Sequence, residues 1–482
     1  MKSLFIRHCA VLFTLLIVPV LLSNAQEKHQ YYEPTDQLVQ QKLAKWQDMK
    51  FGLLMHWGPY SQWGIVESWS ICAEDEDWCR RSNPDYTAYK KEYEDLGKTF
   101  NPVRFNPEKW AKAAAKAGMK YLVFTTKHHD GFCMFDTKLT DYKVTAAWCP
   151  FHLQPKADIA KELFNAFRKE GLWAGAYFSK PDWHCPDYWW PNFATPDRNV
   201  NYDVKRYPDR WEKYVKFTHG QIEELVRDYG PLDILWFDGG WVQKMTDEKA
   251  KELQSNNTGA FQHFQNQDIR MDEISAMARK YQPGIIVVDR AVEGPNQNYL
   301  TPENTVPEQY LNYPWESCII AGGGWSWVPG ANYMSGRKAI HTLIDVVAKG
   351  GNLLLNIAPG PDGDWDPAAY TLLGEIGDWL TINGEAIYNT KAIKPYKEGK
   401  CGFTQGNDGT MYAIYMAGED ETQLPSKIML YECFPKPDAV ITLSGSNTPL
   451  KFKVSGDGCV VEIPKNLQKP YCKFAWVLKI KK

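Results

Sequence analysis

The sequence predicts an α/β protein, a (β/α)8-like barrel followed by a small antiparallel β-sandwich. Two observations predict the barrel: apolar strands alternate with amphipathic helices from about residue 45 to 385, and polar side chains gather where these strands end. A third predicts the sandwich, because after about residue 395 strands follow one another without a helix. We expect a signal peptide at 1–25, the catalytic barrel at 26–392 and the sandwich at 393–482.

Residues 1–25 have the pattern of a cleaved secretory signal. Two basic residues precede an apolar run over residues 10–22, and Ser23 and Ala25 place small side chains where a signal peptidase cuts. The run is shorter than a membrane span, and no later segment approaches that length. We therefore expect export to the periplasm or the extracellular space, and no membrane span.

The first clear helix–strand unit covers residues 106–132. Asn106 and Pro107 start a helix that Gly118 ends, and "MKYLVFTTKHHDGF" follows as a buried strand. Four more units, at residues 156–183, 210–241, 274–290 and 339–363, repeat this order. Continuous apolar strands between amphipathic helices indicate a parallel sheet that is buried on both faces.

The C-terminal segment is built differently. Short strands are predicted at residues 410–418, 426–434, 439–445, 450–464 and 473–480, and Gly, Pro and Asp turns separate them. This spacing is typical of an antiparallel sandwich.

Composition excludes some function classes. The chain has 482 residues and a formal net charge of -3, so nothing in its charge indicates nucleic acid or an anionic membrane as a partner. It also has 20 Trp and 26 Tyr, several of them beside Gly, Asp or His. Such rings often form the walls of sugar sites, although Trp is also common in large cores.

Polar residues at the strand ends decide between a barrel and an open sheet. In a barrel the carboxyl ends of all strands meet on one face, which carries the active site, whereas an open sheet brings fewer of them together. No Gly-x-Gly-x-x-Gly turn indicates a dinucleotide site. The residues at or just after predicted strand ends are His56, His128, His129, Tyr177, Asp238 and Arg290.

Asp238 is the first candidate for catalysis. The segment "LDILWFDGGW" is apolar until Asp238, and we expect Gly239 and Gly240 to leave space for a ligand. An Asp at this position can also cap a helix, but no amphipathic helix begins directly after "DGGWVQKM".

The histidines indicate a polyol site more than a metal site. His128 and His129 are adjacent, so on a regular strand they point to opposite faces, and no His-Glu-x-x-His spacing is present. Imidazoles are well suited to hydrogen-bond the hydroxyls of a neutral sugar. We expect neither a metal nor a cofactor.

Eight strings carry a resemblance to a known family. They are "KFGLLMHWGPYS", "TTKHHDGF", "YFSKPDW", "DILWFDGGW", "VVDR", "PWES", "GGNLLLNIAPGPDG" and "NGEAIYNT", in this order. Over roughly residues 45–390 the chain resembles glycoside hydrolase family 29, the retaining α-L-fucosidases, whose members also carry a trailing sandwich.

The resemblance implies roles for individual residues. Asp238 matches the family's nucleophile, which attacks the anomeric carbon of fucose, and Trp325 matches an aromatic residue beside the fucose methyl group. Glu67 and Trp69 resemble a Glu-Trp pair of the family, although Ser68 separates them here. The other matches to sugar contacts are His56, His128, His129, Tyr177, Trp236 and Arg290.

The acid/base carboxyl is harder to assign, because the family does not keep it in one recognisable string. Glu303 in "NYLTPEN" is our first choice, since it follows a "DR" strand and a short loop, as in one branch of the family. Glu316 in "PWES" is the alternative, and a structural role is equally compatible with that string. Glu67, Glu293 and Glu308 stay open as further candidates.

The resemblance implies an exo-acting retaining α-L-fucosidase with a fucosylated oligosaccharide or glycoconjugate as substrate. Two other hypotheses stay open: a glycosidase for an α-L-galactose-like sugar, and a catalytically silent carbohydrate-binding protein with the same fold. An insertion at residues 242–271, directly after the nucleophile strand, is a candidate wall for the leaving-group side of the site. The sequence does not indicate the linkage or the oligomeric state.

Overall fold

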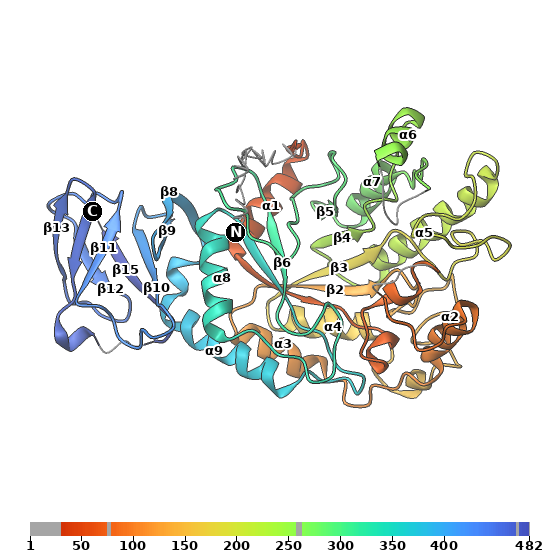
Figure 1. Cartoon of the computed structure of the whole chain (residues 1–482), viewed down its shortest axis with the longest axis horizontal. Coiled ribbons are helices and arrows are strands. Elements are labelled where there is room, and N and C mark those ends of the chain that lie inside the picture. Colours follow the sequence, from red (N-terminus) through yellow and green to blue (C-terminus); the bar gives the residue numbers. More distant parts are fainter. Residues whose placement is uncertain (1–29, 75–78, 257–262, 469–471, 482) are drawn as a thin grey trace, which may run out of the picture. The chain divides into compact units, whose positions relative to one another are not determined.

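The computed structural model describes residues 30–74, 79–256, 263–468 and 472–481 (Figure 1). The predicted signal peptide lies outside these residues. None of the helices in the described ranges is long and apolar enough to cross a membrane. These helices are α1 (Gln37–Met49), α2 (Tyr86–Glu94), α3 (Pro107–Lys116), α4 (Ile159–Lys169), α5 (Pro208–Asp228), α6 (Asp247–Asn256), α7 (Met271–Tyr281), α8 (Gly336–Ala348) and α9 (Pro367–Asn383).

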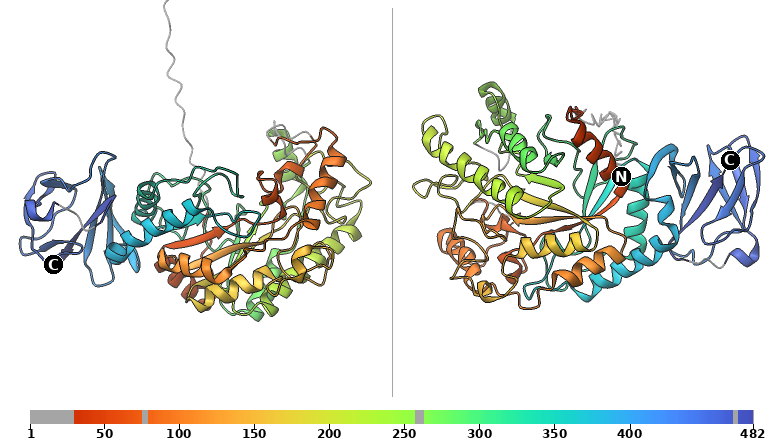
Figure 2. Two further views of the ribbon diagram at one scale, coloured as in Figure 1. Left: turned by 90° about the horizontal axis from the view of Figure 1, so that it is seen from below. Right: turned by 180° about the vertical axis from the view of Figure 1, so that it is seen from behind.

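The first part of the chain folds around a curled sheet of seven parallel strands in the order β5-β4-β3-β2-β1-β7-β6 (Figures 1 and 2). Helices cover its outer face, with α4 against β2 and β3 and α8 against β7. The predicted barrel with a following sandwich is confirmed. The strands are β1 (Phe51–Met55), β2 (Tyr121–Lys127), β3 (Trp173–Ser179), β4 (Ile234–Asp238), β5 (Ile286–Asp289), β6 (Glu316–Ile320) and β7 (Asn352–Asn356).

An irregular segment, residues 297–304, fills the gap between β5 and β6. It forms single bridges to both strands: Gln297 to Val288 on β5, and Glu303 to Cys318 on β6. The N–H of Cys318 donates to Pro302 O at 3.2 Å. Pro302 has no N–H to donate and Asn304 has a positive φ of 48°, so a regular eighth strand does not form here. The segment nevertheless closes the barrel wall, and it carries Glu303.

Alternation along the strands sets what faces the barrel interior. On β4, Ile234 and Trp236 pack in the interior cluster, whereas Leu235 and Phe237 pack against the outer helices. Asp238 is the next residue with interior orientation, so its carboxylate emerges at the barrel mouth. A strand with this pattern needs apolar residues on both faces until its last position, as "ILWFD" provides.

The C-terminal strands form two antiparallel sheets, ordered β12-β15-β10-β9-β8 and β11-β14-β13. They have a core of their own, but Ile414 and Val477 belong to the core of the barrel. Because β8 starts at Thr390, it runs across the predicted boundary at 392/393, and that boundary stays a prediction. The strands are β8 (Thr390–Glu398), β9 (Cys401–Gly406), β10 (Met411–Met416), β11 (Lys427–Tyr431), β12 (Val440–Leu443), β13 (Lys451–Ser455), β14 (Gly458–Glu462) and β15 (Ala475–Lys481).

Candidate active site

Asp238 lies at the barrel mouth with 15% of its side chain exposed. Its Oδ2 accepts a hydrogen bond from the Tyr177 hydroxyl at 2.7 Å, and its Oδ1 accepts from the N–H of Gly239 at 2.8 Å. Burial alone raises the pKa of Asp238, but the positive charge of Arg290, the nearby His129 ring and these two hydrogen-bond donors together lower it by more. The net pKa lies well below the ordinary value, so Asp238 is a carboxylate at neutral pH.

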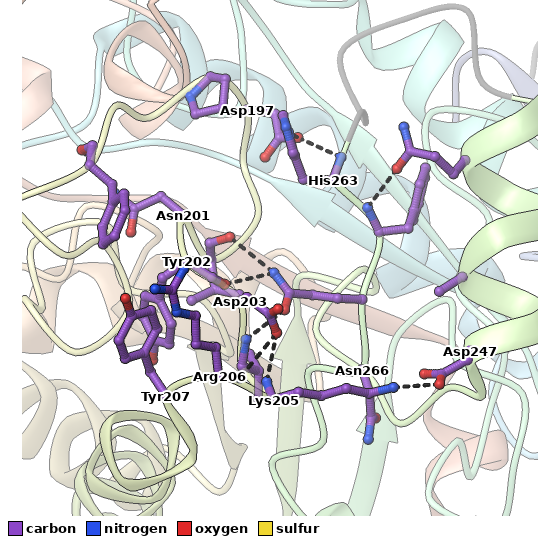
Figure 3. A pocket seen from close by; sticks show the side chains of 18 of the residues that line it. Asp197, Asn201, Tyr202, Asp203, Lys205, Arg206, Tyr207, Asp247, His263 and Asn266 are labelled. Carbon is purple, nitrogen blue, oxygen red and sulfur yellow. Dashed lines mark hydrogen bonds and ion pairs between the residues drawn. The ribbon is translucent and has the colours of Figure 1, made fainter.

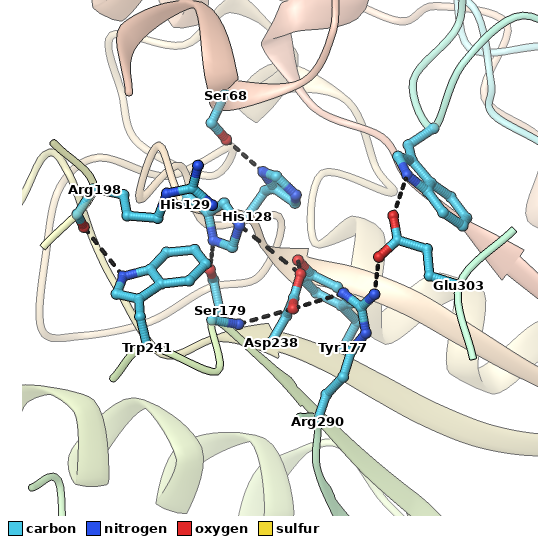
Figure 4. A network of polar contacts seen from close by, with 12 residues as sticks. Ser68, His128, His129, Tyr177, Ser179, Arg198, Asp238, Trp241, Arg290 and Glu303 are labelled. Atoms are coloured by element: carbon cyan, nitrogen blue, oxygen red, sulfur yellow. Dashed lines mark hydrogen bonds and ion pairs between the residues drawn. The ribbon is translucent and has the colours of Figure 1, made fainter. Parts of the chain in front are cut away.

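Arg290 joins the two candidate catalytic carboxylates (Figure 4). One terminal nitrogen of its guanidinium donates to Asp238 Oδ1 at 2.9 Å, and the other donates to Glu303 Oε2. The remaining oxygen of Glu303 accepts from the indole N–H of Trp325 at 3.2 Å. The structure thus brings Asp238 and Glu303 to opposite ends of one guanidinium, although 65 residues separate them in the sequence.

His128 and His129, which follow β2, are held by serines (Figure 4). The Nδ1 of His128 lies 2.5 Å from the Ser68 hydroxyl, and the Nδ1 of His129 is hydrogen-bonded to the Ser179 hydroxyl. The Nε2 of His129 lies 3.8 Å from Asp238 Oδ2. The contact with Ser179 thus leaves the Nε2 of His129 facing the carboxylate.

His56, which follows β1, is positioned by a residue of the neighbouring strand β7. Its Nδ1 lies 2.9 Å from the amide oxygen of Asn356, the last residue of β7. Burial lowers the pKa of His56 to about 4 and that of His129 to about 3, and it lowers the pKa of His128 well below its usual value. All three imidazoles are therefore neutral near pH 7, which suits hydrogen bonds to uncharged hydroxyls.

Aromatic rings wall the site. The ring of Trp325 lies 5.2 Å from that of His56, and the ring of Tyr177 stacks on that of Trp236 at 5.3 Å. On the other side, the rings of Trp69 and Trp241 lie 5.3 and 5.2 Å from His129. Each predicted substrate contact therefore lies in or directly beside this cluster.

Glu67 is a second acid beside the carboxylates. Its side chain is buried, its Oε1 accepts from the N–H of Ser326 at 2.8 Å, and its Oε2 has no hydrogen-bond partner among the described residues. Burial raises its pKa to about 8, with a contribution from the negative charges of Glu303 and Asp238. Glu67 therefore carries a proton at neutral pH and is able to donate it in a hydrogen bond.

Glu316 lies elsewhere in the barrel. It is the first residue of β6, at the opposite end of the strands from Asp238, and its Oε2 accepts from the Tyr121 hydroxyl at 2.5 Å. Burial raises its pKa to about 7. Glu293 and Glu308 are exposed, as Glu303 is, so exposure does not separate these three candidates. The contacts of Arg290 with both Asp238 and Glu303 favour Glu303 as the partner of Asp238.

Three groups at the site have the composition of a metal site, since His128, His129 and Asp238 each offer a ligand atom within 4.8 Å of the others. The residues do not fit a cation well. Both oxygens of Asp238 already accept hydrogen bonds, and the Arg290 guanidinium lies 2.9 Å away and repels a dication. The set fits the hydroxyl groups of a sugar better.

Gly239 and Gly240 have a different role from the expected one. A Cβ on Gly239, which has a φ of 89°, meets Pro181 Cδ at 2.3 Å. A Cβ on Gly240 meets the carbonyl oxygen of Arg290 at 3.0 Å. These glycines therefore let the chain segments after β3 and β5 pack against the end of β4, and they do not make room for a ligand.

The insertion after β4 borders a cavity of about 800 Å³ (Figure 3). The cavity lies between residues 193–207 on one side and residues 247–254 and 263–266 on the other, and His263 contacts Asp197 there at 2.9 Å. None of the predicted site residues lines it. Arg198, which follows the lining residue Asp197 in the sequence, places its guanidinium 4.4 Å from the ring of Trp69. The proposed wall for the leaving-group side stays a prediction.

Several residues at the site were missed from the sequence. Ser68, Ser179 and Asn356 fix the three imidazoles, and Trp241 and Arg198 extend the aromatic wall. Asn356 and Ser179 end their strands, so the signal that identified Asp238 was available for them too. Ser68 gave no signal, because its contact with His128 joins residues 60 positions apart.

Known proteins are similar to this chain along most of its length. The family model described as Alpha-L-fucosidase matches residues 19–385. An alpha-L-fucosidase from Branchiostoma floridae is 29% identical, covering 93% of this chain and 96% of that protein. The plasma alpha-L-fucosidase of Homo sapiens is 27% identical, covering 93% and 92%.

Solved structures share the fold. Alpha-L-fucosidase isoenzyme 1 from Paenibacillus thiaminolyticus is 27% identical with a TM-score of 0.70, over 92% of this chain and 99% of that chain. An alpha-L-fucosidase of Bacteroides thetaiotaomicron, trapped as a covalent intermediate with 2-fluoro-fucosyl fluoride, is 22% identical with a TM-score of 0.70 over 94% and 98%.

Proposed function

The chain belongs to the α-L-fucosidase family, glycoside hydrolase family 29, and we propose that it is an exported, exo-acting, retaining enzyme that removes terminal α-L-fucose from glycans. It is a glycoside hydrolase by this membership. The retaining mechanism, the export and the individual residue roles are the proposed part.

One observation carries the proposal: Arg290 holds Asp238 and Glu303 at its two terminal nitrogens. A retaining glycosidase needs its two carboxyls about 5 Å apart, whereas an inverting one needs roughly 6.5–9.5 Å to admit a water. Two acceptors on a single guanidinium are close neighbours, which supports the shorter spacing. The covalent intermediate trapped in the Bacteroides thetaiotaomicron enzyme agrees with this mechanism.

In the first step, an oxygen of Asp238 forms a bond to the anomeric carbon of fucose while the bond to the leaving oxygen breaks. Glu303 gives its proton to that oxygen. In the second step Glu303 takes a proton from water, the water oxygen bonds to the anomeric carbon, and Asp238 is released as a carboxylate. Arg290 and Tyr177 hold the nucleophile in its ionised form between turnovers.

Glu303 must change its contacts to act as an acid. Both of its oxygens accept hydrogen bonds in the structure, from Arg290 and from Trp325, and a protonated oxygen needs to donate instead. Because Glu303 is 43% exposed, the arriving sugar is able to displace one of these contacts. We propose that this displacement accompanies protonation of Glu303.

The hydroxyls of the sugar are bound by neutral groups. His56, His128 and His129 are uncharged near pH 7, and Glu67 carries a proton. Such groups donate and accept hydrogen bonds without adding charge beside the developing oxocarbenium ion. We assign Trp325 to the wall next to the fucose methyl group.

Export rests on residues 1–25, which have a basic start, an apolar stretch and small residues before Gln26. We expect the mature protein to begin at Gln26. Amino-terminal sequencing of the protein recovered from the periplasm or medium tests this, and an intact residue 1 in a cytosolic fraction contradicts it.

The activity is tested on a panel of aryl glycosides and fucosylated glycans, including aryl α-L-galactoside. We expect turnover of the α-L-fucoside and its loss in Asp238→Ala, by at least about 10⁴-fold, with unchanged circular dichroism. Activity is expected to persist after chelator treatment. Faster turnover of the galactoside supports the related glycosidase, and binding without any turnover supports the carbohydrate-binding protein.

A further inference from the structure

We propose that the buried ion pair between Lys180 and Asp289 is a positioning device for the catalytic carboxylates. It joins the ends of β3 and β5 across the outer face of β4, and so fixes Asp238 and Arg290 relative to each other. This inference rests on the proposed function, because it assigns a role in the reaction to residues that do not touch the site.

The pair lies at the level of the nucleophile. Lys180 Nζ is 2.5 Å from Asp289 Oδ1, and the side chains are 0% and 4% exposed. Lys180 follows β3 and Asp289 ends β5, and β4 lies between these two strands. The ion pair therefore spans the strand that ends in Asp238.

Both partners are connected to the site through the backbone. The N–H of Lys180 donates to the carbonyl oxygen of Asp238 at 2.9 Å. The N–H of Arg290, the residue after Asp289, donates to the carbonyl oxygen of Phe237 at 3.1 Å. A shift of either strand end therefore moves the backbone of the nucleophile or the base of the Arg290 side chain.

The pair lies on the opposite face of the sheet from the site. Phe178 and Phe237 pack against the outer helices, and Ser179 faces His129, so Lys180 and Asp289 point outward by alternation. The hydroxyl of Tyr214 on α5 also donates to the carbonyl oxygen of Lys180. The tight packing of Pro181 against Gly239 leaves little room for the strand ends to shift separately.

Stability alone is a poor explanation for this pair. Apolar residues of similar volume often replace a buried ion pair with little or no loss of stability, because desolvation offsets the attraction between the charges. Removing only one partner leaves an uncompensated charge and endangers folding. The informative variant is therefore the double substitution Lys180→Met/Asp289→Leu, which removes both charges together.

The matched control is Lys42→Met. Lys42 forms an ion pair with Asp233 at 2.8 Å, and Asp233 directly precedes β4 at the end of the strand that is remote from the site. Both variants remove an ion pair beside the same strand. Only the Lys180/Asp289 pair lies at the level of Asp238.

We expect the double variant to keep the wild-type melting temperature within a few degrees and KM within about threefold, but to lose at least tenfold in kcat on an aryl α-L-fucoside. A misplacement of about 1 Å at a catalytic group costs on the order of 10²-fold. Lys42→Met is expected to keep the wild-type kcat.

The pH profile gives a readout that a purely structural role does not change. If Arg290 moves away from Asp238, the pKa of Asp238 rises and the acidic limb of kcat/KM moves to higher pH, by about one unit or more. The other titratable groups that face Asp238 are His56, Glu67, His128, His129, Tyr177 and Glu303. None of them is changed in either variant.

The inference is overturned if the double variant folds, keeps the wild-type kcat and shows the acidic limb of kcat/KM at the wild-type pH. That result leaves the proposed function intact. A crystal structure of the double variant supplies a readout that needs no turnover. An Arg290–Asp238 separation longer than the present 2.9 Å supports positioning, and an unchanged separation contradicts it. The crystal structure tests the positioning of Arg290 even if the wild type hydrolyses no fucoside. Such a lack of hydrolysis overturns the proposed function and leaves the positioning of Arg290 by the ion pair to be decided by the structure.

Discussion

At the scale of single residues, the site combines one carboxylate that is ionised at neutral pH, Asp238, with one acid that holds a proton, Glu67. Asp238 is surrounded by donors and a guanidinium, whereas Glu67 is buried beside two other carboxylates. The same functional group, a carboxyl, is thus ionised at one position and protonated at the other because of its surroundings. The sequence identified both positions, but it did not assign the proton to Glu67, because that depends on burial.

The role of Glu303 is tested with Glu303→Ala. We expect turnover of a natural fucosylated glycan to fall by about 10²–10⁴-fold, because its leaving group needs a proton. Aryl fucosides with good leaving groups are expected to keep most of the glycosylation rate, and azide is expected to rescue their turnover as a fucosyl azide. Glu316→Gln serves as the comparison. Wild-type activity of Glu303→Ala on the glycan contradicts the assignment.

Because Glu67 is protonated at neutral pH, we expect kcat/KM to fall on the alkaline side of its pH profile. Because its pKa is raised to about 8, the acid loses its proton and its donor capacity as pH rises through that value. We expect kcat/KM to fall above pH 8 in the wild type, and Glu67→Gln to keep partial activity without this limb. Pre-steady-state and steady-state pH profiles of both proteins measure it, and a limb that persists in Glu67→Gln contradicts the assignment.

Glu67 also links stability to pH. Between its unfolded value of 4.5 and about 8, the folded chain holds a proton that the unfolded chain has released. The contribution of Glu67 to stability is thus complete below about pH 4.5 and decreases by up to about 1.4 kcal/mol per pH unit until about pH 8. Glu67→Gln is expected to flatten the melting temperature across this window.

At the scale of elements, the two candidate catalytic carboxylates lie on very different parts of the barrel wall. Asp238 ends a central strand that is hydrogen-bonded on both sides, whereas Glu303 lies on the irregular segment 297–304. The periodicity of apolar residues predicted β2, β3, β4, β5 and β7 as parts of helix–strand units, and it did not predict β6. This periodicity could not predict that residues 297–304 complete the barrel wall. The segment contains Pro302 and forms single bridges instead of a continuous ladder, so its sequence has no repeating apolar pattern.

The close packing of Gly239 against Pro181 at the end of β4 predicts the effect of Gly239→Ala. The new Cβ meets Pro181 at 2.3 Å and the residue keeps a φ of 89°, so we expect a loss of about 2–4 kcal/mol in stability and a clear fall in kcat. Gly171→Ala is the control, since Gly171 has a similar φ of 78° and no atom within 4 Å of a Cβ. Equal effects of the two substitutions in urea unfolding and kinetics contradict the packing role.

At the scale of the whole chain, the sandwich and the barrel share packing. The indole N–H of Trp379 on α9 donates to the carbonyl oxygen of Ala475 at 2.8 Å, and His341 on α8 contacts the carbonyl oxygen of Phe474 at 2.8 Å. Ile414 and Val477 are part of the barrel core. The change of strand pattern after residue 395 predicted the sandwich, but no local pattern could show that it contributes to the larger core.

Truncation after residue 392 tests this shared core. In the shortened chain Trp379 is no longer covered by the sandwich, and apolar surface of α8 and α9 becomes exposed. We therefore expect this chain to aggregate or to melt at least 10 °C lower than the full chain. The full chain is expected to unfold in one calorimetric transition. A soluble truncated protein with the wild-type melting temperature and activity contradicts the prediction and supports two independent domains.

The irregular segment between β5 and β6 also means that the two candidate catalytic positions tolerate changes of chain length differently. A residue inside a continuous ladder cannot gain or lose a neighbour without shifting every later pair, so an insertion within β4 displaces Asp238. Residues 297–304 are held by isolated bridges and single hydrogen bonds, so a change of chain length there does not shift a regular ladder. The position that carries Glu303 is thus less constrained in sequence than the position that carries Asp238.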